Sequence, residues 1–511
     1  MDQSIVPRAV DDLTSWHSDW NGLRVAVLGL GVTGFSVADT LVELGSSVLV
    51  VASGGNDEQV ALLEVIGAAY LERELSTVPG EVVDFDPELL VVSPGFHPDH
   101  PLLVWAAEHG IPIWGDIELA WRVRDKVLPV AEWVLVTGTN GKTTTTQLTT
   151  HLLAADGKRV ASVGNIGVPV LDAVRYPAGF DVLVVELSSY QLHWLGQTAN
   201  GTLTPWASVC LNIADDHLDW HGSAAAYRDA KAKVYTNTRV AAVYNRADDA
   251  TRHMVEAADV IEGCRAVGFG LDAPGPSDFG IVDGILCDRA FLTERATTAL
   301  EIGTREELVV AGLGAPHTVA NVLAAAALAR SLDVPPEVIR GALGTFRLDH
   351  HRTEVVANVD EILWIDDSKA TNPHAAEASL RAHKSVVWIV GGLLKGVDID
   401  ELVRAQASRL AAVVLIGVDR GPLLAAFARH APELPVFEVD TADTNEVMPT
   451  AVRLSASVAK AGDVVLLAPA AASMDQFIDY ADRGTRFADA VRRHLGGSAD
   501  DDDAPSANPA G

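Results

Sequence analysis

Residues 134–145 read VLVTGTNGKTTT, and this stretch indicates the fold class. A β-branched apolar run leads into a glycine-containing loop, then into Lys142 and Thr143, and then into a segment with leucines at helical spacing. Glycines let backbone N–H groups turn toward a polyphosphate, and the N-terminus of the following helix favours negative charge. We therefore expect a loop that binds ATP, in which Lys142 contacts the phosphates and Thr143 ligates Mg²⁺.

Composition excludes several classes of protein. The chain has 511 residues, of which 48% are hydrophobic, and a net charge of −31. An acidic surface repels the phosphates of nucleic acids, so we expect no nucleic-acid partner. No apolar run reaches the ~18 residues that a membrane-spanning helix needs. The start of the chain lacks the pattern of a signal peptide, and the three cysteines have no metal-binding spacing. We expect a cytoplasmic protein that does not insert into membranes.

Strand and helix patterns alternate along the chain and predict an α/β fold. We expect three domains: a Rossmann-like domain at 21–130, a central P-loop ATPase-like domain with a mostly parallel sheet at 131–347, and a C-terminal Rossmann-like domain at 348–495. Residues 1–20 are predicted to be an irregular, loose arm, and 496–511 a disordered acidic tail. The stretch 264–290, rich in Gly, Pro and Asp, is predicted to be a surface excursion.

A second glycine turn, GLGVTG at 29–34, follows the apolar strand pattern at 24–28. It matches a dinucleotide-binding fingerprint, which also requires a carboxylate at the end of the next strand to bind the ribose. That strand ends in ASG at 52–54 and has no carboxylate. We therefore favour a nucleotide-diphosphate substrate over a structural tight turn, and both over NAD.

Polar residues follow other strand patterns of the central region. Glu186 ends the strand 181–185, at the edge where parallel sheets bind ligands, and is a candidate Mg²⁺ ligand beside Thr143; a solvated glutamate is the alternative. His217 follows another strand and is either a metal or phosphate ligand or a structural histidine. Lys231 lies in a helical pattern, and composition alone predicts an exposed lysine.

Five motifs occur in a fixed order, namely GTNGKT (138–143), GNIG (164–167), ELSSYQL (186–192), DHLD (216–219) and DSKATN (367–372). Together they resemble the Mur ligases of peptidoglycan synthesis, from about residue 23 to about residue 495. Within that family, ELSSYQL, the triplet at 93–95 and GDIEL at 115–119 favour the member that adds D-glutamate. The resemblance implies an ATP-dependent amide ligase that joins D-glutamate to UDP-N-acetylmuramoyl-L-alanine through an acyl phosphate.

The resemblance also implies site residues. Those expected to contact ATP are Gly138, Thr139, Asn140, Gly141, Lys142, Thr143, Thr144, Asn321, Arg352 and Asp367. Those expected to contact the uridine-diphosphate substrate are Gly31, Val32, Thr33, Ser93, Pro94, Gly95, Asn165, Ser188 and Gln191. Those expected to bind D-glutamate are Lys369, Thr371, Lys395, Ser473 and Tyr480. The chain departs from the family pattern at three places. Thr318 stands where an adenine-binding Asn is usual, and Tyr480 stands where Phe is often found. Residues 52–54 are Ala-Ser-Gly, whereas one family pattern has Asp-Thr-Arg there.

Two Mg²⁺ ions are implied by the resemblance. Thr143 and Glu186 would hold one, and His217 and a carbamylated Lys231 the other. Carbamylation converts a cation into an anionic oxygen ligand, which a hard metal requires. Lys142, His217 and Lys231 are the expected catalytic residues.

Two other functions remain open. The first is a different ligase of the same fold, such as the L-alanine-adding member; a folate-extending enzyme should lack the glycine turn at 29–34. The second is a nucleotide-binding regulator without ligase activity, which should have lost Lys142, Glu186, His217 or Lys231, yet all four are present. We expect a monomer.

Overall fold

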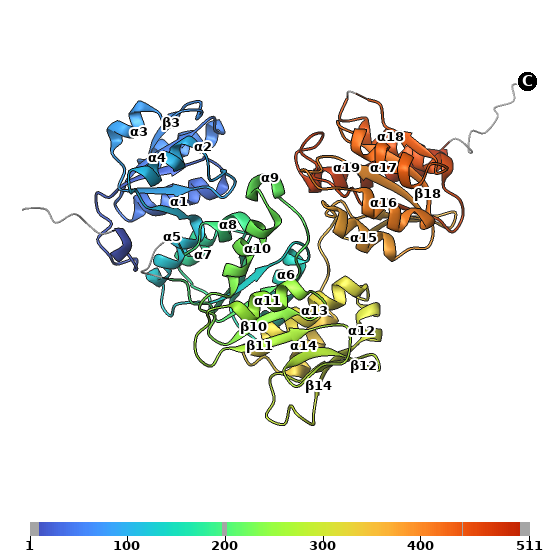
Figure 1. Cartoon of the computed structure of the whole chain (residues 1–511), viewed down its shortest axis with the longest axis horizontal. Coiled ribbons are helices and arrows are strands. Elements are labelled where there is room, and N and C mark those ends of the chain that lie inside the picture. The colour runs from blue at the N-terminus through green and yellow to red at the C-terminus, as the bar shows by residue number, and fades with distance from the viewer. Residues whose placement is uncertain (1–9, 197–201, 442, 501–511) are drawn as a thin grey trace, which may run out of the picture. The chain divides into compact units, whose positions relative to one another are not determined.

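The computed structural model describes residues 10–196, 202–441 and 443–500, which contain three sheets (Figure 1). The chain forms two compact units, one made of 1–213 and 225–346 and the other of 214–224 and 347–511. The first unit contains a five-stranded and a nine-stranded sheet, and the second contains a six-stranded sheet. Among the described residues, no helix is both long enough and apolar enough to cross a bilayer.

The first sheet is parallel throughout, with strand order β3-β2-β1-β4-β5. Its strands are β1 (Arg24–Leu28), β2 (Ser47–Ala52), β3 (Ala69–Glu72), β4 (Leu89–Val92) and β5 (Ile113–Gly115). Its helices are α1 (Val32–Glu43), α2 (Asp57–Ile66), α3 (Gly80–Phe85), α4 (Pro101–Glu108) and α5 (Asp116–Arg122). Val25 and Val27 pack in a core with α1, whereas Leu28 packs in a second core with α4. Both faces are therefore covered, as in a Rossmann-like fold.

The second sheet has the order β14-β13-β12-β11-β10-β9-β6-β8-β7, and its strand pairs are parallel except for β12–β13 and β13–β14, which are antiparallel. Its strands are β6 (Glu132–Thr137), β7 (Val160–Gly164), β8 (Val182–Glu186), β9 (Ala207–Cys210), β10 (Ala241–Asn245), β11 (Arg265–Phe269), β12 (Asp278–Val282), β13 (Ile285–Asp288) and β14 (Leu300–Thr304). The prediction of a surface excursion at 264–290 was wrong. β11, β12 and β13 extend the sheet, and Asp283 and Gly284 form the turn of a β-hairpin.

The helices around this second sheet are η2 (Arg124–Lys126), α6 (Lys142–Ala155), α7 (Val170–Arg175), α8 (Ser189–His193), α10 (Ala224–Ala232), η3 (Lys233–Tyr235), α11 (Asp249–Ala257), α12 (Arg305–Val310), α13 (Pro316–Ser331) and α14 (Pro336–Leu343). Helix α13 is almost entirely buried, because its Ala- and Leu-rich sequence presents apolar side chains on every face. It packs against α6, the helix that follows the glycine loop at 138–141.

The third sheet, in the second unit, has the order β15-β16-β20-β17-β18-β19 and is parallel except for β15. Its strands are β15 (Glu354–Val359), β16 (Ile362–Asp366), β17 (Val386–Gly391), β18 (Leu410–Ile416), β19 (Val436–Glu438) and β20 (Val464–Leu467). Its helices are α15 (Pro373–Arg381), α16 (Asp400–Gln406), η4 (Ala407–Arg409), α17 (Gly421–His430), α18 (Val447–Val458) and α19 (Tyr480–Asp500). Trp388 and Val390 pack with α15 to α17, and Val387 and Ile389 with α18 and α19. The predicted α/β architecture is confirmed.

Both ends of the described chain are more ordered than predicted. Val10, in the 3₁₀ helix η1 (Val10–Asp12), is buried, as are Leu13 and Trp20, and the Arg122 guanidinium donates to the backbone oxygens of Asp11 and Leu13. The prediction of a loose arm was therefore wrong for residues 10–20, while 1–9 lie outside the described residues. Helix α19 continues to Asp500, beyond the predicted start of the tail at 496, and 501–511 also lie outside the description.

The glycine turn at 29–34 offers a stability test. A Cβ on Gly34 would lie 2.1 Å from the backbone oxygen of Gly29, whereas a Cβ on Gly31 would meet nothing within 4 Å. We expect Gly34→Ala to lower the free energy of unfolding by about 1–3 kcal/mol, because the backbone must shift. Gly31→Ala, the matched control, should change it by less than about 0.5 kcal/mol. Urea unfolding of both variants checks this, and equal stability would contradict it.

Candidate functional site

The glycine loop at 138–141, here called the phosphate loop, joins β6 to α6 as the sequence predicts. Gly138 and Gly141 have φ values of +150° and +84°, which side chains other than hydrogen disfavour. A Cβ on Gly141 would lie 2.5 Å from Asn321 Oδ1, so Asn321 packs directly on the loop. Thr318, the departure from the family pattern, is buried in α13. The structure thus brings Asn321 to the loop, and its expected contact with adenine stays a prediction.

Side-chain and backbone contacts hold the phosphate loop in place. The Thr139 and Asn140 amides donate to the backbone oxygen and to Oδ1 of Asn212, at 2.9 and 2.8 Å. Lys142 Nζ donates to the backbone oxygens of Gly138 and Thr139, both at 2.9 Å. The lysine therefore lies over the loop, where a bound phosphate would meet it.

Glu186 is the last residue of β8 and pairs in register with Val136, two residues before the phosphate loop. Its side chain is buried, and Oε1 accepts a hydrogen bond of 2.8 Å from Asn165 Nδ2. Oε2 is buried and has no hydrogen-bond partner within the described part of the chain. A buried carboxylate oxygen without a partner is costly. Its place at the end of β8, in register with the strand that leads into the phosphate loop, suits an oxygen ligand of Mg²⁺.

Lys231 is buried, which corrects the exposed lysine predicted from composition. Helix α10 directs the side chain toward the phosphate loop, where Nζ donates to Gly138 O at 2.9 Å and to Thr137 Oγ1 at 3.3 Å. Nζ also lies 5.0 Å from the ring centroid of Tyr227, whose hydroxyl is 2.9 Å from Thr139 Oγ1. Sequence reasoning missed Tyr227; its spacing of four residues from Lys231 was the available signal.

His217 lies in the segment 214–224, which groups with the second unit. It has a φ of +53°, and it precedes the short helix α9 (Leu218–His221). Its backbone N–H donates to Asp216 Oδ1 at 3.0 Å. Left-handed backbone conformations in residues other than glycine concentrate at functional sites. The shared metal site of His217 and Lys231 stays a prediction.

The first sheet brings together the two segments expected to bind the uridine-diphosphate substrate. Strand order reverses between β1 and β4, and Rossmann-like sheets bind ligands at this switch point. The turn containing Gly31, Val32 and Thr33 follows β1, and Ser93, Pro94 and Gly95 follow β4. A Cβ on Gly29 would lie 2.8 Å from Ser93 Oγ, so the two segments touch. Ser93 Oγ is itself buried and has no partner among the described residues.

Asn165, Ser188 and Gln191 gather around the end of β8. The Asn165 amide N–H donates to the backbone oxygen of Glu186 at 2.9 Å. Ser188 caps α8, and Gln191 Oε1 accepts from both Ser188 N and Ser188 Oγ at 3.1 Å. Ser188 Oγ in turn accepts from Gln191 N at 3.2 Å. Ser188 and Gln191 are therefore hydrogen-bonded to each other, and Asn165 is hydrogen-bonded to Glu186, two residues before Ser188.

Four of the five residues expected to bind D-glutamate lie on loops at the carboxyl ends of neighbouring strands, and the fifth begins a helix. Lys369 and Thr371 follow β16, Lys395 follows β17, Ser473 follows β20, and Tyr480 begins α19. Leu393 and Ala472 exchange backbone hydrogen bonds of 3.0 Å, which join the second and third loops. Lys369 Nζ lies 3.5 Å from the ring centroid of Tyr480, a cation–π contact.

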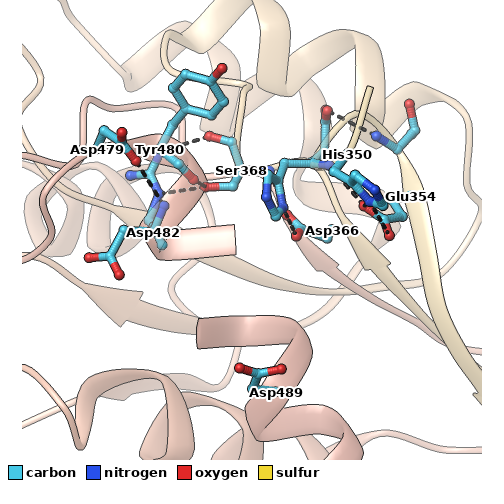
Figure 2. Close-up of polar contacts among 12 residues, drawn as sticks. His350, Glu354, Asp366, Ser368, Asp479, Tyr480, Asp482 and Asp489 are labelled. Carbon is cyan, nitrogen blue, oxygen red and sulfur yellow. Dashed lines mark hydrogen bonds and ion pairs between the residues drawn. The ribbon is translucent and has the colours of Figure 1, made fainter. Parts of the chain in front are cut away.

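Arg483 joins these loops, and sequence reasoning missed it. Its guanidinium donates to Ser368 Oγ at 2.9 Å, to Ser368 O at 2.8 Å and to Ala471 O at 3.1 Å. Ser368 Oγ also donates to Tyr480 O at 2.8 Å (Figure 2). Arg483 is fully buried, and this burial lowers its pKa to about 10. The only signal in the sequence was an arginine on the apolar face of α19.

Arg352 and Asp367 lie close to each other at the same edge of the sheet. The charge of Arg352 favours ionisation of Asp367, but desolvation dominates and raises the pKa of Asp367 to about 6. The backbone N–H of Thr353 donates to Asp367 Oδ1 at 3.2 Å. Next to this pair, His351 Nδ1 is 2.7 Å from Asp366 Oδ2, a contact that raises the pKa of His351 (Asp366 is labelled in Figure 2).

Known proteins resemble the chain over nearly its whole length. Family models match at residues 23–115 (Mur ligase MurD-like, N-terminal domain), 136–329 (Mur ligase middle domain) and 351–471 (Mur ligase, glutamate ligase domain). A UDP-N-acetylmuramoylalanine–D-glutamate ligase of Leifsonia xyli is 66% identical over 496 residues, 96% of each chain. One of Streptomyces avermitilis is 52% identical over 478 residues, 93% of this chain and 99% of its own.

Solved structures share the fold at low sequence identity. A UDP-N-acetylmuramate-alanine ligase from Thermotoga maritima superimposes with a TM-score of 0.53 at 20% identity, over 93% of this chain and 99% of its own. A MurF ligase from the same organism, in complex with ADP, gives a TM-score of 0.54 at 17% identity, over 88% and 96%. These structural similarities support the three-sheet fold. The family models and the sequence relatives show that the chain belongs to the Mur ligase family.

Proposed function

We propose that this protein is an ATP-dependent ligase that joins D-glutamate to UDP-N-acetylmuramoyl-L-alanine in peptidoglycan synthesis. The observation that carries the proposal is the 66% identity, over 96% of both chains, with a relative that bears the name of this ligase. The buried, unpartnered Oε2 of Glu186 next to the phosphate loop supports the use of a nucleotide with Mg²⁺. We also propose that the enzyme acts in the cytoplasm, where ATP is available, and as a monomer.

In the first step, a carboxylate oxygen of the muramoyl-alanine attacks the γ-phosphorus of ATP, and ADP leaves. The phosphate loop amides and Lys142 would hold the phosphates and align them for in-line transfer. Thr143 and Glu186 would hold one Mg²⁺, which neutralises charge on the phosphates. Asn321, Arg352 and Asp367 would contact the remainder of the nucleotide.

In the second step, the amine of D-glutamate attacks the acyl carbon, phosphate leaves and the amine loses a proton. The amino acid carries two carboxylates, which require cationic and hydroxyl partners. Lys369, Lys395, Thr371 and Ser473 offer these groups from loops at one edge of the third sheet. His217 and a carbamylated Lys231 would hold a second Mg²⁺ beside the acyl phosphate.

Phosphate release tests the reaction and the amino acid together. With ATP, Mg²⁺ and UDP-N-acetylmuramoyl-L-alanine, we expect release with D-Glu and none with L-Glu, L-Ala, D-Ala or no amino acid. Lys142→Ala should reduce the rate at least about 100-fold, because charge on the transferred phosphate loses its partner. Lys158→Ala, which removes a lysine paired with Asp156 in the same domain, is the matched control and should keep the rate. Release with L-Ala would indicate another ligase of the family, and ATP binding without release a regulator.

Carbamylation of Lys231 has its own spectroscopic test. We expect wild-type protein incubated with ¹³C-bicarbonate to show a carbamate carbon signal by NMR. Lys231→Arg should lose both this signal and the activity, because arginine keeps the positive charge but forms no carbamate. Lys233→Arg, two residues away, should keep the signal. A signal that persists in Lys231→Arg, or an active wild-type enzyme without any signal, would contradict the assignment.

A further inference from the structure

Asp116 is a buried carboxyl group that the proposed reaction does not use. It is the first residue of α5, directly after β5, and its exposed fraction is 4%. Oδ1 is buried and has no hydrogen-bond partner among the residues described. Desolvation raises the pKa of Asp116 to about 6. Retaining such a group costs stability, which suggests a role other than stability.

The only side chain that donates to Asp116 in the described part of the chain is Gln191, whose Nε2 lies 3.1 Å from Asp116 Oδ2. Gln191 is also buried. A side-chain amide has a donor end and an acceptor end, and the two can exchange places by a flip. An ionised carboxylate only accepts, so Asp116 binds the NH₂ end. The oxygen end of Gln191 must then face Ser188.

This orientation determines what Ser188 can offer to a ligand. Its hydroxyl proton is donated to Gln191 Oε1 at 3.1 Å, and one lone pair accepts from Gln191 N at 3.2 Å. A hydroxyl has one proton and two lone pairs, so one lone pair of Ser188 remains. Ser188 is half-buried and can reach a ligand. It therefore presents an acceptor, which suits an amide N–H. If Gln191 flipped, Ser188 would lose the acceptor for its proton, and its hydroxyl could donate instead.

The surrounding packing holds α8 where this contact needs it. A Cβ on Gly115 would lie 3.1 Å from Trp194 Cβ, so the turn before Asp116 and the end of α8 touch closely. Trp194 is buried in the core beneath the first sheet. At the same end of α8, Lys233 Nζ donates to the backbone oxygens of His193 and Leu195 at 2.7 and 2.9 Å.

We propose that Asp116 is a positioning residue for the acyl substrate: it orients the Gln191 amide so that Ser188 presents a hydrogen-bond acceptor to an amide N–H of the muramoyl-alanine. The inference rests on the proposed function, because that function assigns Ser188 and Gln191 to this substrate. In this proposal Asp116 itself contacts no substrate. It lies on the helix that follows β5 of the first sheet, whereas Ser188 and Gln191 lie at the helix that follows β8 of the second sheet.

Asp116→Leu tests the inference, since leucine has the same number of side-chain heavy atoms, branched at the same position, but no acceptor. We expect the Kd of UDP-N-acetylmuramoyl-L-alanine, measured by calorimetry, and its KM to rise roughly three- to tenfold, the effect of one hydrogen bond. The KM values for ATP and D-glutamate should stay within about twofold. Asp116→Asn, which can still accept from Gln191 through Oδ1, should restore most of the affinity. The midpoint of urea unfolding should not fall, because the substitution removes a buried carboxyl group whose Oδ1 has no partner in the described part of the chain.

Two further variants separate positioning from general structural effects. Asp39→Ala removes the 2.7 Å contact between α1 and Arg175 of α7, another link between the first and second sheets, and should leave the Kd unchanged. In a Ser188→Ala background, Asp116→Leu should add nothing to the Kd.

An unchanged Kd in Asp116→Leu, or an undiminished effect in the Ser188→Ala background, would overturn the inference. Calorimetry needs no turnover, so wild-type protein that binds the substrate but releases no phosphate with D-glutamate would contradict the proposed function alone.

Discussion

Two lysine side chains donate to the same backbone carbonyl of the phosphate loop, and the electrostatics of this loop depend on how the two positive charges are balanced. Lys142 Nζ and Lys231 Nζ each lie 2.9 Å from Gly138 O. Two positively charged groups hydrogen-bonded to one oxygen atom repel each other. Both changes invoked by the proposed function would relieve this repulsion. A polyphosphate would pair with Lys142, and carbamylation would replace the positive charge of Lys231.

All three sheets use the same geometric principle. Side chains proposed to bind ligands lie on loops after the carboxyl ends of parallel strands: β1 and β4 in the first sheet, β6 and β8 in the second, and β16, β17 and β20 in the third. The sequence predicts these placements well, because an apolar strand followed by glycine or polar residues is a local pattern. The glycine loop at 138–141 and the turn at 29–34 were recognisable for this reason, whereas the segment 367–372 was identified by its resemblance to the Mur ligases.

Contacts between distant segments were not predictable in the same way. Lys231 has the local pattern of an exposed helical lysine, and its burial depends on Gly138, which lies 93 residues earlier in the chain. Arg483 is buried because it binds Ser368, 115 residues away. Residues 10–20 read as an irregular arm, yet the guanidinium of Arg122 donates hydrogen bonds to the backbone oxygens of Asp11 and Leu13 and holds the segment in place. Periodicity and composition report on neighbours in sequence, and these pairs are neighbours only in the folded chain.

Two buried polar atoms without partners lie where ligands are proposed to bind. Glu186 Oε2 and Ser93 Oγ both lie at strand ends that the fold makes available to ligands, and each leaves an acceptor unsatisfied within the described chain. Arg483 and Gln191 are also buried and polar, but their hydrogen bonds run to protein groups that they hold in position. An unsatisfied carboxylate oxygen costs more than an apolar replacement. The unsatisfied carboxylate oxygen of Glu186 beside the phosphate loop is explained if a bound cation becomes its partner. The same group would then cost stability in the free protein and bind the cation needed for the reaction.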